Sequence, residues 1–398
     1  MRWIAGGVTA AKGFLASGVS AGIKRSRKPD LALVVADWPV TAAGVFTTNR
    51  VQAAPVRISQ ERLRSGRAQA VLLNSGCANC LTGAAGLRDA RRLARTLSGR
   101  LGVDERDVLV ASTGLIGRRL PGARIERAIP RLVAQLGRAN HTAAAQAILT
   151  TDQRVKEAAV EAAIDGRTCR LGGMAKGAGM IAPSMATMLC VLTTDVAVTP
   201  AWLRGVLQGA AEATFNRISV DGAMSTNDTV LALAGGRSGV TIRPRTAGAR
   251  TVVRMMQAVM GQLATLMVQD GEGASRIMDV QVIGARTDQE AQACARQVAC
   301  SPLVKTMLAG GDPNVGRIAA AVGASGARFD PSALEVWIEG QRVVWRGAVV
   351  PLRKTASRVL LRRPAVTVRI GLHAGQGGGR MLTCDLTEAY VRLNTRYT

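Results

Sequence analysis

One stretch near the middle of the chain, residues 171–190, joins a glycine-rich run to a threonine that directly precedes an apolar strand. It reads L-G-G-M-A-K-G-A-G-M-I-A-P-S-M-A-T-M-L-C and holds Lys176, one of seven lysines among 398 residues. Its glycines permit backbone turns that other residues avoid. Two interpretations follow. Spacing alone favours a turn before a buried strand, and the alternative is a loop that presents a nucleophile, Thr187.

The rest of the chain indicates one large layered protein or two to three domains. Hydrophobic residues make up 47% of it, and no linker or low-complexity segment interrupts it. Strand and helix patterns mix without regular β-α-β alternation, so we expect an α+β layered fold. No apolar run approaches the ~18–20 residues of a membrane helix, and the N-terminus lacks a secretory signal. We therefore expect a cytoplasmic protein with no membrane partner.

Hydrophobic periodicity places the main elements. The expected strands are 31–36, 43–49, 70–76, 108–111, 188–198, 230–233, 334–338 and 366–370. The expected helices are 87–97, 124–149, 202–215, 251–268, 287–298 and 302–321, the last interrupted at 310–314.

The net charge of +25 is the least ordinary property of the composition. Such a balance suggests nucleic acid or acidic ligands. Of 52 basic residues 45 are arginine, however, and they are scattered, while aromatic residues that could stack on bases amount to 3%. A compositional preference for arginine over lysine on solvent-exposed faces explains the positive charge better than a nucleic-acid partner does. A basic nucleic-acid-binding protein on a decayed enzyme scaffold stays open as an alternative.

Cysteine and histidine usage narrows the chemistry. Cys77 and Cys80 form a C-x-x-C pair, but no second pair is spaced for zinc, so we expect no metal site and no redox role. Neither of the two histidines, His141 and His373, sits in a catalytic motif. A hydroxyl nucleophile would then need another base.

A threonine at a new N-terminus supplies that base from its own α-amine, whose ordinary pKa of about 7.7–8.0 is close to working pH. Here it requires cleavage between Ala186 and Thr187. An oxyanion hole needs fixed backbone N–H groups, and Ser112-Thr113-Gly114, at the end of an expected strand, is a candidate. Lys176 could hold a substrate carboxylate. Glu272 could hold an ammonium, although a solvated loop carboxylate is the plainer interpretation.

Together these stretches resemble the ornithine acetyltransferases, or glutamate N-acetyltransferases, of arginine biosynthesis. The resemblance covers nearly the whole length, and the block around residues 176–189 is the most specific part. The matching segments are 6–9, 12–14, 44–49, 74–76, 112–117, 150–152, 176–183, 185–189, 225–229, 270–274, 312–314 and 385–387.

The resemblance implies a fold and an activity. The fold is an α/β layered sandwich like that of N-terminal-nucleophile hydrolases. The chain would cut itself into residues 1–186 and 187–398, which both contribute to one active site and assemble as two α and two β chains. Thr187 would take acetyl from N2-acetylornithine and pass it to glutamate in a ping-pong scheme. No cofactor is implied, although some members accept acetyl-CoA as a co-substrate.

The resemblance also assigns residues. Thr113 and Gly114 would form the oxyanion hole. The substrate site would be lined by six residues: Thr150, Lys176, Thr187, Glu272, Asn394 and Thr398.

The sequence departs from the family at four places. Cys77 stands where asparagine is usual, Ala223 where an acidic residue is common, and Val315 where tryptophan is usual. The tail is one residue short between Asn394 and Thr398, which would shift the last threonine by up to ~3.3–3.6 Å. We expect the first three to lower stability or activity.

An N-terminal-threonine aminopeptidase or amidase on a related fold is the alternative enzyme. Lys176 and Glu272 suit a small zwitterion and favour the transferase. Transfer of acetyl to glutamate, as opposed to release of free acetate, separates the two.

Overall fold

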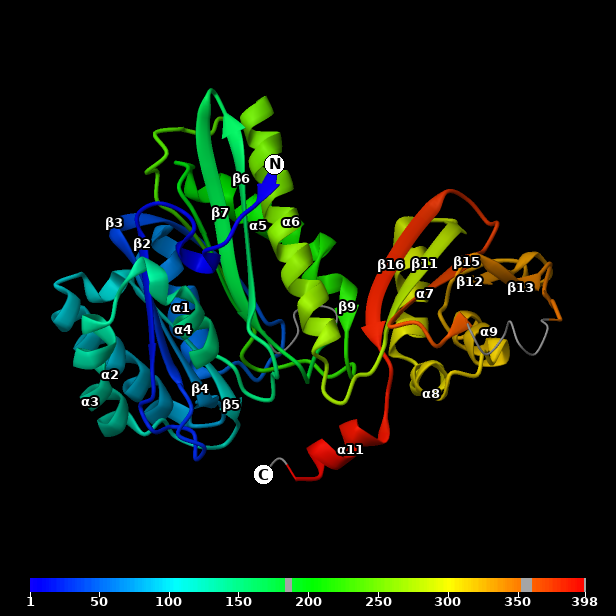
Figure 1. Ribbon diagram of the computed structural model, residues 1–398, viewed down its shortest axis with the longest axis horizontal. Helices are drawn as coiled ribbons and strands as arrows, with labels where there is room; N and C mark the ends of the chain where they lie inside the picture. Colours follow the sequence, from blue (N-terminus) through cyan, green and yellow to red (C-terminus); the bar gives the residue numbers. More distant parts are fainter. Residues whose placement is uncertain (183–187, 352–359, 397–398) are drawn as a thin grey trace. The chain divides into compact units, whose positions relative to one another are not determined.

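The architecture comes from a computed structural model, which describes residues 1–182, 188–351 and 360–396 (Figure 1). The chain divides into two compact units. The first comprises Met1–Gly177, Ser184–Asn216 and Met224–Met267, and the second comprises Ala178–Pro183, Arg217–Ala223 and Val268–Thr398. The chain thus passes from the first unit to the second and back around the glycine-rich stretch.

The first unit is built on a mixed nine-stranded sheet. Its path runs β1-β6-β7-β8-β10-β3-β4-β5, and β2 pairs with β3. β4 and β5 are parallel, as are β8 and β10, and the other pairs are antiparallel. The strands are β1 (Arg2–Trp3), β2 (Phe14–Val19), β3 (Leu31–Phe46), β4 (Arg67–Cys77), β5 (Val108–Leu115), β6 (Lys156–Ile164), β7 (Arg167–Lys176), β8 (Leu189–Thr194) and β10 (Thr229–Ala234).

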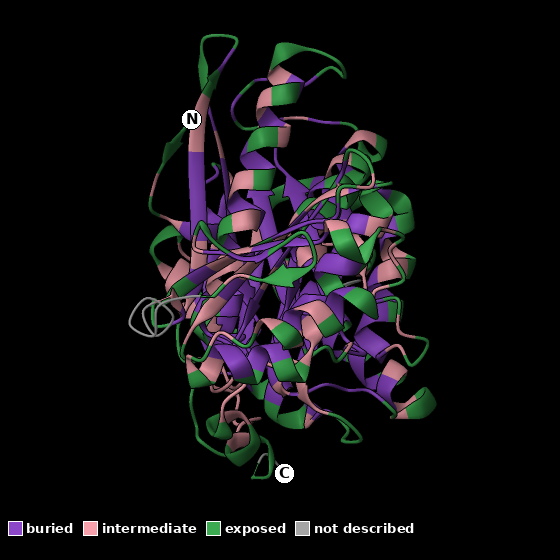
Figure 2. Cartoon of the chain, turned by 90° about the vertical axis from the view of Figure 1, so that its right-hand side faces the viewer, coloured by how far each residue is buried: buried purple, intermediate pink, exposed green. Residues whose placement is uncertain are grey.

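Successive residues of β3 enter two different cores, because side chains alternate between the faces of a strand. Ala32 and Val34 pack into a core that also holds residues of β7, β8 and β10. Leu31 and Leu33 pack into a second core with α2 and α3. Burial on both faces explains why the central strands are continuous apolar runs, and Figure 2 shows the strands as largely buried.

Helices cover both faces of this sheet. α2 and α3 pack on each other over one face, and α4 packs on β2 and β3. α6 carries a buried stripe, and its Leu263 lies against Gly173 of β7. The helices are α1 (Ala54–Arg62), α2 (Gly83–Leu101), α3 (Gly122–Ala134), α4 (His141–Ala147), α5 (Pro200–Ala213) and α6 (Ala247–Gln269).

α6 is long and apolar enough to cross a membrane by length and composition. Half of its most apolar window is buried against the rest of the protein. That is weak evidence for a membrane span, because the core helix of a soluble protein has the same properties.

The second unit is a seven-stranded sheet of order β14-β13-β12-β15-β11-β16-β9 with helices packed on it. α7 lies on β11 and β16, and Thr287, directly before it, is its N-cap, because the Thr287 hydroxyl accepts the Glu290 N–H. Its elements are β9 (Ile218–Ser219), β11 (Ile277–Ala285), β12 (Glu335–Ile338), β13 (Gln341–Trp345), β14 (Ala348–Val349), β15 (Ala365–Gly371), β16 (Gly377–Cys384), α7 (Asp288–Cys300), α8 (Pro302–Gly310), α9 (Val315–Gly323) and α11 (Glu388–Asn394).

Mixed sheets covered by helices confirm the α+β layered expectation, but three segments differ from prediction, two of them as follows. The helix expected over 124–149 is broken, because Gly137 is extended and exchanges backbone hydrogen bonds with Ala16 of β2 at 3.0 and 3.3 Å. The two strands expected over 31–36 and 43–49 are one, β3, whose register with β4 shifts between Val35 and Val40.

The glycine-rich stretch is also corrected. Gly172 and Gly173 lie inside β7, not in a turn. A Cβ on Gly172 would lie 1.9 Å from the Gly7 carbonyl oxygen, and one on Gly173 would lie 2.5 Å from a Leu192 methyl carbon. These two glycines therefore serve close packing, and the strand continues to Lys176.

Candidate active site

The predicted oxyanion residues lie at the end of two parallel strands. β4 and β5 pair Ser75 with Thr113 and Gly76 with Gly114. Gly114 has a φ of +126°, and a Cβ there would lie 2.4 Å from the carbonyl carbon of Gly76. Only glycine fits such a position. The local sequence therefore brings the backbone of Thr113 and Gly114 close to the end of β4.

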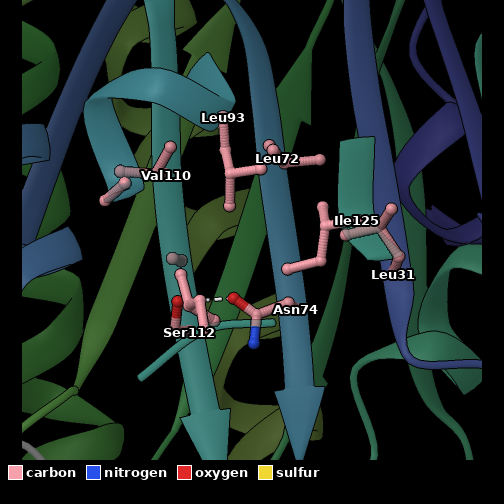
Figure 3. Close-up of a pocket in the computed structure, with 10 residues that line it drawn as sticks. Leu31, Leu72, Asn74, Leu93, Val110, Ser112 and Ile125 are labelled. Atoms are coloured by element: carbon pink, nitrogen blue, oxygen red, sulfur yellow. Dashed lines mark hydrogen bonds between the residues drawn. The ribbon is translucent and has the colours of Figure 1, made fainter. Parts of the chain in front are cut away.

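A buried polar network ties this strand end to the turn before β10. Ser112 Oγ donates to Asn74 Oδ1 at 2.6 Å, as Figure 3 shows beside a cavity of about 10 Å³ lined mainly by Leu72, Leu93 and other apolar side chains. Asn227 Nδ2 donates to the carbonyl oxygens of Ser112 and Ala78, at 2.8 and 2.7 Å. Buried and satisfied polar groups of this kind fix a backbone in one arrangement.

Lys176 and Thr150, predicted to bind substrate, are brought together. Lys176 ends β7, opposite Leu189 of β8 in the strand register. Its Nζ donates to Thr150 Oγ1 at 2.7 Å and lies 3.6 Å from Asp152 Oδ2. An ammonium has three donors, and this is the one hydrogen bond that Lys176 Nζ makes to the described residues. The remaining donor capacity suits an incoming carboxylate.

Asp152 organises this cluster, and sequence reasoning gave it no role. Its Oδ1 accepts from Lys156 Nζ and from the Gly177 N–H, each at 2.7 Å. Burial by itself would raise the pKa of the carboxyl, but the Lys176 and Lys156 ammoniums outweigh it and hold the pKa well below its usual range. The pKa of nearby Lys24 falls to about 8, chiefly through burial. Asp152 is therefore a fixed anion between two buried lysines.

Ala186 and Thr187 lie outside the described residues, but the next residue is held on both sides. The Met188 N–H donates to Asp228 Oδ1 at 3.0 Å, and its carbonyl accepts the Thr229 N–H at 3.0 Å. Asn227 and Asp228 are neighbours, so one turn holds both the Ser112 carbonyl before Thr113 and the amide after Thr187.

Glu272 and Asn394 meet in the second unit, where Asn394 Nδ2 donates to Glu272 Oε2 at 2.9 Å. The Glu272 N–H donates to the Ala178 carbonyl at 2.8 Å. A Cβ at Gly179 would lie 2.4 Å from the Glu272 carboxyl carbon, so a larger residue there would displace the Glu272 carboxylate. Glu272 is thus a half-buried, hydrogen-bonded carboxylate rather than a fully solvated one. Thr398 lies outside the described residues.

Asp221 is a second residue that the sequence did not single out, since it was interpreted as part of a polar turn. It accepts the N–H groups of Met180 and Ile181 at 2.7 and 2.9 Å, and the Tyr390 hydroxyl at 3.1 Å. Burial and then the Asp221 charge raise the pKa of Tyr390. Asp221 therefore fixes the segment that leads toward the predicted cleavage site.

The departures from the family pattern fall in different settings. Cys77 is buried at the end of β4, its thiol donates to the Arg118 carbonyl, and burial raises its pKa. Cys77 and Cys80 are both free thiols. Val315 begins α9 and packs on the core of the second unit, whereas Ala223 is exposed. Within 1–182, 188–351 and 360–396, no group of His, Cys, Asp and Glu residues could hold a metal ion.

Comparison with known proteins agrees with the motifs. Residues 15–398 match the model of the ArgJ family. The arginine biosynthesis bifunctional protein ArgJ of Thermosynechococcus vestitus is 45% identical over 412 residues, covering 99% of this chain and 98% of the relative. That of Nitratidesulfovibrio vulgaris is 48% identical over 392 residues, covering 97% and 98%.

A solved structure of ornithine acetyltransferase from Mycobacterium tuberculosis, complexed with ornithine, is 44% identical. It covers 47% of this chain and 99% of its own, with a TM-score of 0.44. The matches to the two ArgJ relatives extend over essentially the full length of both partners. The chain therefore belongs to the ArgJ family of bifunctional acetyltransferases of arginine biosynthesis.

Proposed function

We propose that this protein cuts itself between Ala186 and Thr187 and then moves acetyl from N2-acetylornithine to glutamate through an acetylated Thr187. The observation that carries the proposal is the turn before β10. Its Asn227 side chain holds the carbonyl before Thr113, and its Asp228 side chain holds the amide after Thr187. This arrangement supports the proposal, because acyl transfer requires backbone N–H donors that are fixed close to the nucleophile.

In the proposed first half-reaction, the Thr187 α-amine takes the proton of its own hydroxyl while Oγ attacks the acetyl carbonyl carbon of N2-acetylornithine. Backbone N–H groups around Thr113 and Gly114 stabilise the oxyanion. The C–N bond then breaks, the ornithine nitrogen takes the proton from the α-amine, and an acetyl ester remains on Thr187. The glutamate amine attacks this ester in the second half-reaction, and the alkoxide of Thr187 recovers a proton.

Substrate recognition is proposed to rest on two charges. Lys176 has donor capacity beyond Thr150 and would hold the substrate α-carboxylate. Glu272, held by Asn394, would hold the ammonium of ornithine. The word bifunctional in the names of the relatives supports testing acetyl-CoA as a second acetyl donor. No cofactor takes part in the proposed scheme.

The cleavage proposal is tested on a denaturing gel with N-terminal sequencing. Wild-type protein should run as two pieces, one of which begins at Thr187. Thr187→Ala should give one full-length chain without acetyl transfer, and Thr187→Ser, which keeps a hydroxyl, should still be cut. A fully active wild-type chain that stays intact would overturn the mechanism.

The transfer proposal is tested with N2-acetylornithine and radiolabelled glutamate, and then with acetyl-CoA in place of N2-acetylornithine. Labelled N-acetylglutamate is the expected product. Free acetate, or cleavage of peptide amides without transfer, would instead identify an amidase or aminopeptidase.

A further inference from the structure

A basic cleft of the first unit has no part in the site described above. It measures about 500 Å³, and seven residues from α3 and from the loop after β2 line it. Three of these are the exposed arginines Arg124, Arg127 and Arg131, and the other four are small residues without charge. Ligand pockets commonly measure ~300–1,000 Å³. The cleft is therefore large enough for part of a small molecule, and its charge favours an anion.

The three arginines share one face of α3, because they are spaced by three and four residues. Like charges at this spacing repel each other and cost helix stability. The one acidic residue of α3, Glu126, pairs instead with Arg92 of α2 at 3.0 Å. Among the described residues, Arg127 has no hydrogen-bond or ion-pair partner. A bound anion would offset this repulsion and give Arg127 a partner.

The opposite wall of the cleft holds the outer two arginines in place. Arg124 Nη1 donates to the Gly22 carbonyl at 2.9 Å, and Arg131 Nη2 donates to the Ser20 carbonyl. A guanidinium has five N–H donors, so each keeps most of its donors for a ligand. Guanidinium groups bind phosphate through paired hydrogen bonds. Two oriented guanidiniums on either side of an unpaired third therefore suit a ligand with more than one phosphate.

The loop that forms this wall also reaches the predicted oxyanion residues. Lys24, two residues beyond Gly22, lies against the end of β4, where a Cβ on Gly76 would be 3.5 Å from the Lys24 backbone nitrogen. Gly76 pairs with Gly114 of β5 in the strand register. Asp30, which is fully buried, fixes the loop, because its side chain accepts the Lys24 N–H at 3.0 Å. The cleft and the end of β5 are therefore joined by a short, fixed segment.

These contacts limit the distance between the cleft and the oxyanion residues. Two residues of extended chain, the contact between Lys24 and Gly76 and one strand spacing place the Cα atoms of Gly22 and Gly114 at most about 19 Å apart. The arm of coenzyme A between its pyrophosphate and its sulfur is as long as four to five residues of extended chain, about 15 Å. Phosphates in the cleft and an acetyl group beside Gly114 could therefore belong to one molecule.

We propose that this cleft binds the phosphate groups of acetyl-CoA. The inference rests on the proposed function, which sets acetyl transfer beside Gly114. Of the substrates considered there, N2-acetylornithine and glutamate carry no phosphate, whereas acetyl-CoA carries a pyrophosphate and a 3′-phosphate. The cleft would then hold the phosphates of one donor without contributing to the use of the other.

Binding is measured by calorimetry on the wild-type protein with coenzyme A, dephospho-coenzyme A and inorganic phosphate. Coenzyme A should bind most tightly, and loss of its 3′-phosphate should weaken binding about fivefold or more, roughly one exposed charged contact. Its affinity should also fall between 50 and 200 mM salt, because the charges are exposed. A wild-type protein that does not bind coenzyme A, or that binds inorganic phosphate equally well, would overturn the proposal.

Arg127→Gln is the variant of choice, because Arg127 has no partner to lose and its removal relieves repulsion along α3. It should raise the KM for acetyl-CoA about fivefold or more, with kcat unchanged. Changing all three arginines to glutamine should raise this KM further. Arg100→Gln is the matched control, since it removes the same charge from an exposed position of α2 outside the cleft and should leave the KM unchanged.

Two donors without phosphate separate ligand binding from a structural role. Transfer from N2-acetylornithine and from S-acetyl-N-acetylcysteamine, a short acetyl thioester, should be the same in wild type and in the triple variant. Equal losses with all donors would show that the arginines only support the fold. An unchanged KM for acetyl-CoA in the triple variant would place the phosphates elsewhere. Displacement of coenzyme A by a DNA duplex at 200 mM salt would instead assign the cleft to nucleic acid.

This inference and the proposed function fail differently. A protein that transfers no acetyl from N2-acetylornithine to glutamate removes the proposed function, and calorimetry still tests the cleft. Normal transfer from N2-acetylornithine in a protein that does not bind coenzyme A keeps that function and removes only the role of the cleft.

Discussion

Asp152 and Asp228 are two buried aspartates of the first unit whose pKa values are shifted in opposite directions by burial and neighbouring charges. Both are desolvated, which raises a carboxyl pKa. Asp152 lies between two ammoniums that reverse the effect, whereas the single charge near Asp228 does not. One sequence pattern, an aspartate beside threonines, therefore has a lowered pKa in one place and a raised pKa in the other.

The depressed pKa of Asp152 predicts a pH-dependent contribution to stability. A carboxyl with a lowered folded pKa stabilises the protein above its unfolded pKa, about 3.9, and loses that contribution as pH falls below it. The stability difference between wild type and Asp152→Asn should be constant above about pH 5 and shrink by about 1 kcal/mol per pH unit below 3.9. Urea unfolding from pH 6 to pH 3 measures it.

Asp228→Asn is the control for this pH series, because the pKa of Asp228 is raised in the folded protein. A raised pKa makes stability change with pH in the direction opposite to that expected for Asp152. The unfolded chain releases the Asp228 proton above about pH 3.9 while the folded chain keeps it, so wild type loses stability as pH rises. The stability of Asp228→Asn relative to wild type should therefore improve from pH 4 to pH 7. Parallel changes in the two variants would contradict the opposite assignments.

Lys156 and Lys176 should differ when each is changed to methionine. Lys156 forms the closer ion pair with Asp152, at 2.7 Å against 3.6 Å for Lys176. Both lysines pair with buried Asp152, and removing one partner of a buried pair costs about 3–5 kcal/mol. Lys156→Met should lie at the upper end of this range, because Lys156 also donates a hydrogen bond to Asp152, and Lys176→Met at the lower end, because its 3.6 Å contact with Asp152 is too long for one. Urea midpoints of the two variants in the uncleaved Thr187→Ala background measure the difference.

Activity should separate the same two lysines. Lys176→Met with Thr187 intact should raise the KM for glutamate at least tenfold, roughly the loss of one charged hydrogen bond. An unchanged KM would remove Lys176 from carboxylate binding. A larger stability loss for Lys176→Met than for Lys156→Met would contradict the assignment of the ion pair.

At the scale of elements, the predicted cut would leave the sheet of the first unit intact. Residues 1–186 supply β1 to β7, and residues 187–398 supply β8 and β10. In the sheet, β8 and β10 lie between β7 on one side and β3 on the other. The two product chains are therefore interleaved by strand pairing on both sides.

Interleaved strands predict that the two pieces stay together after cleavage. They should co-elute from a size-exclusion column at neutral pH and separate only in denaturant, because separation breaks the pairings of β7 with β8 and of β10 with β3. Two pieces that elute apart without denaturant would contradict this arrangement. A mass of twice the 41.6 kDa precursor would fit the two α and two β chains that the resemblance implies.

The elements that the sequence predicted best are those with a local signal. β8 and β10 are buried strands centred on short apolar runs, residues 189–192 and 230–234, and α6 has a clear buried stripe. The break at Gly137 and the extension of β7 to Lys176 were missed, because both depend on partners far along the chain, Ala16 of β2 and the strands beside β7. The presence of a glycine in the sequence does not show whether that residue forms a turn or allows close packing.

The candidate site divides in the same way. The sequence motifs identified Thr150 and Lys176 as site residues, and the fold joins the two with a hydrogen bond. The group that holds them, Asp152 with its partner Lys156, is defined by distance and burial, which composition and spacing do not encode. For the turn before β10, the S-T-N-D motif at 225–228 was the one available signal in the sequence. It identified the residues of the turn but not what their side chains bind.

For the whole molecule, the net charge of +25 still needs an interpretation. Many acidic groups form ion pairs with arginine, as Asp89 does with Arg119 and Asp279 does with Arg380. In two exposed tryptophans, Trp38 and Trp345, an arginine stacks on the ring at 3.8 Å and covers one of its faces. These contacts favour a general excess of positive charge on the protein surface over a specific nucleic-acid-binding site.

That view predicts weak, salt-sensitive binding to nucleic acid that is separable from catalysis. Binding of a fluorescent random-sequence DNA duplex should fall by orders of magnitude between 50 and 200 mM salt, as counterion release requires. Acetyl transfer at 200 mM salt should be unchanged by excess DNA, because the proposed substrates are small and the site is built from buried groups. Tight binding that persists at 200 mM salt, or inhibition of transfer by DNA, would instead support a nucleic-acid function for the basic surface.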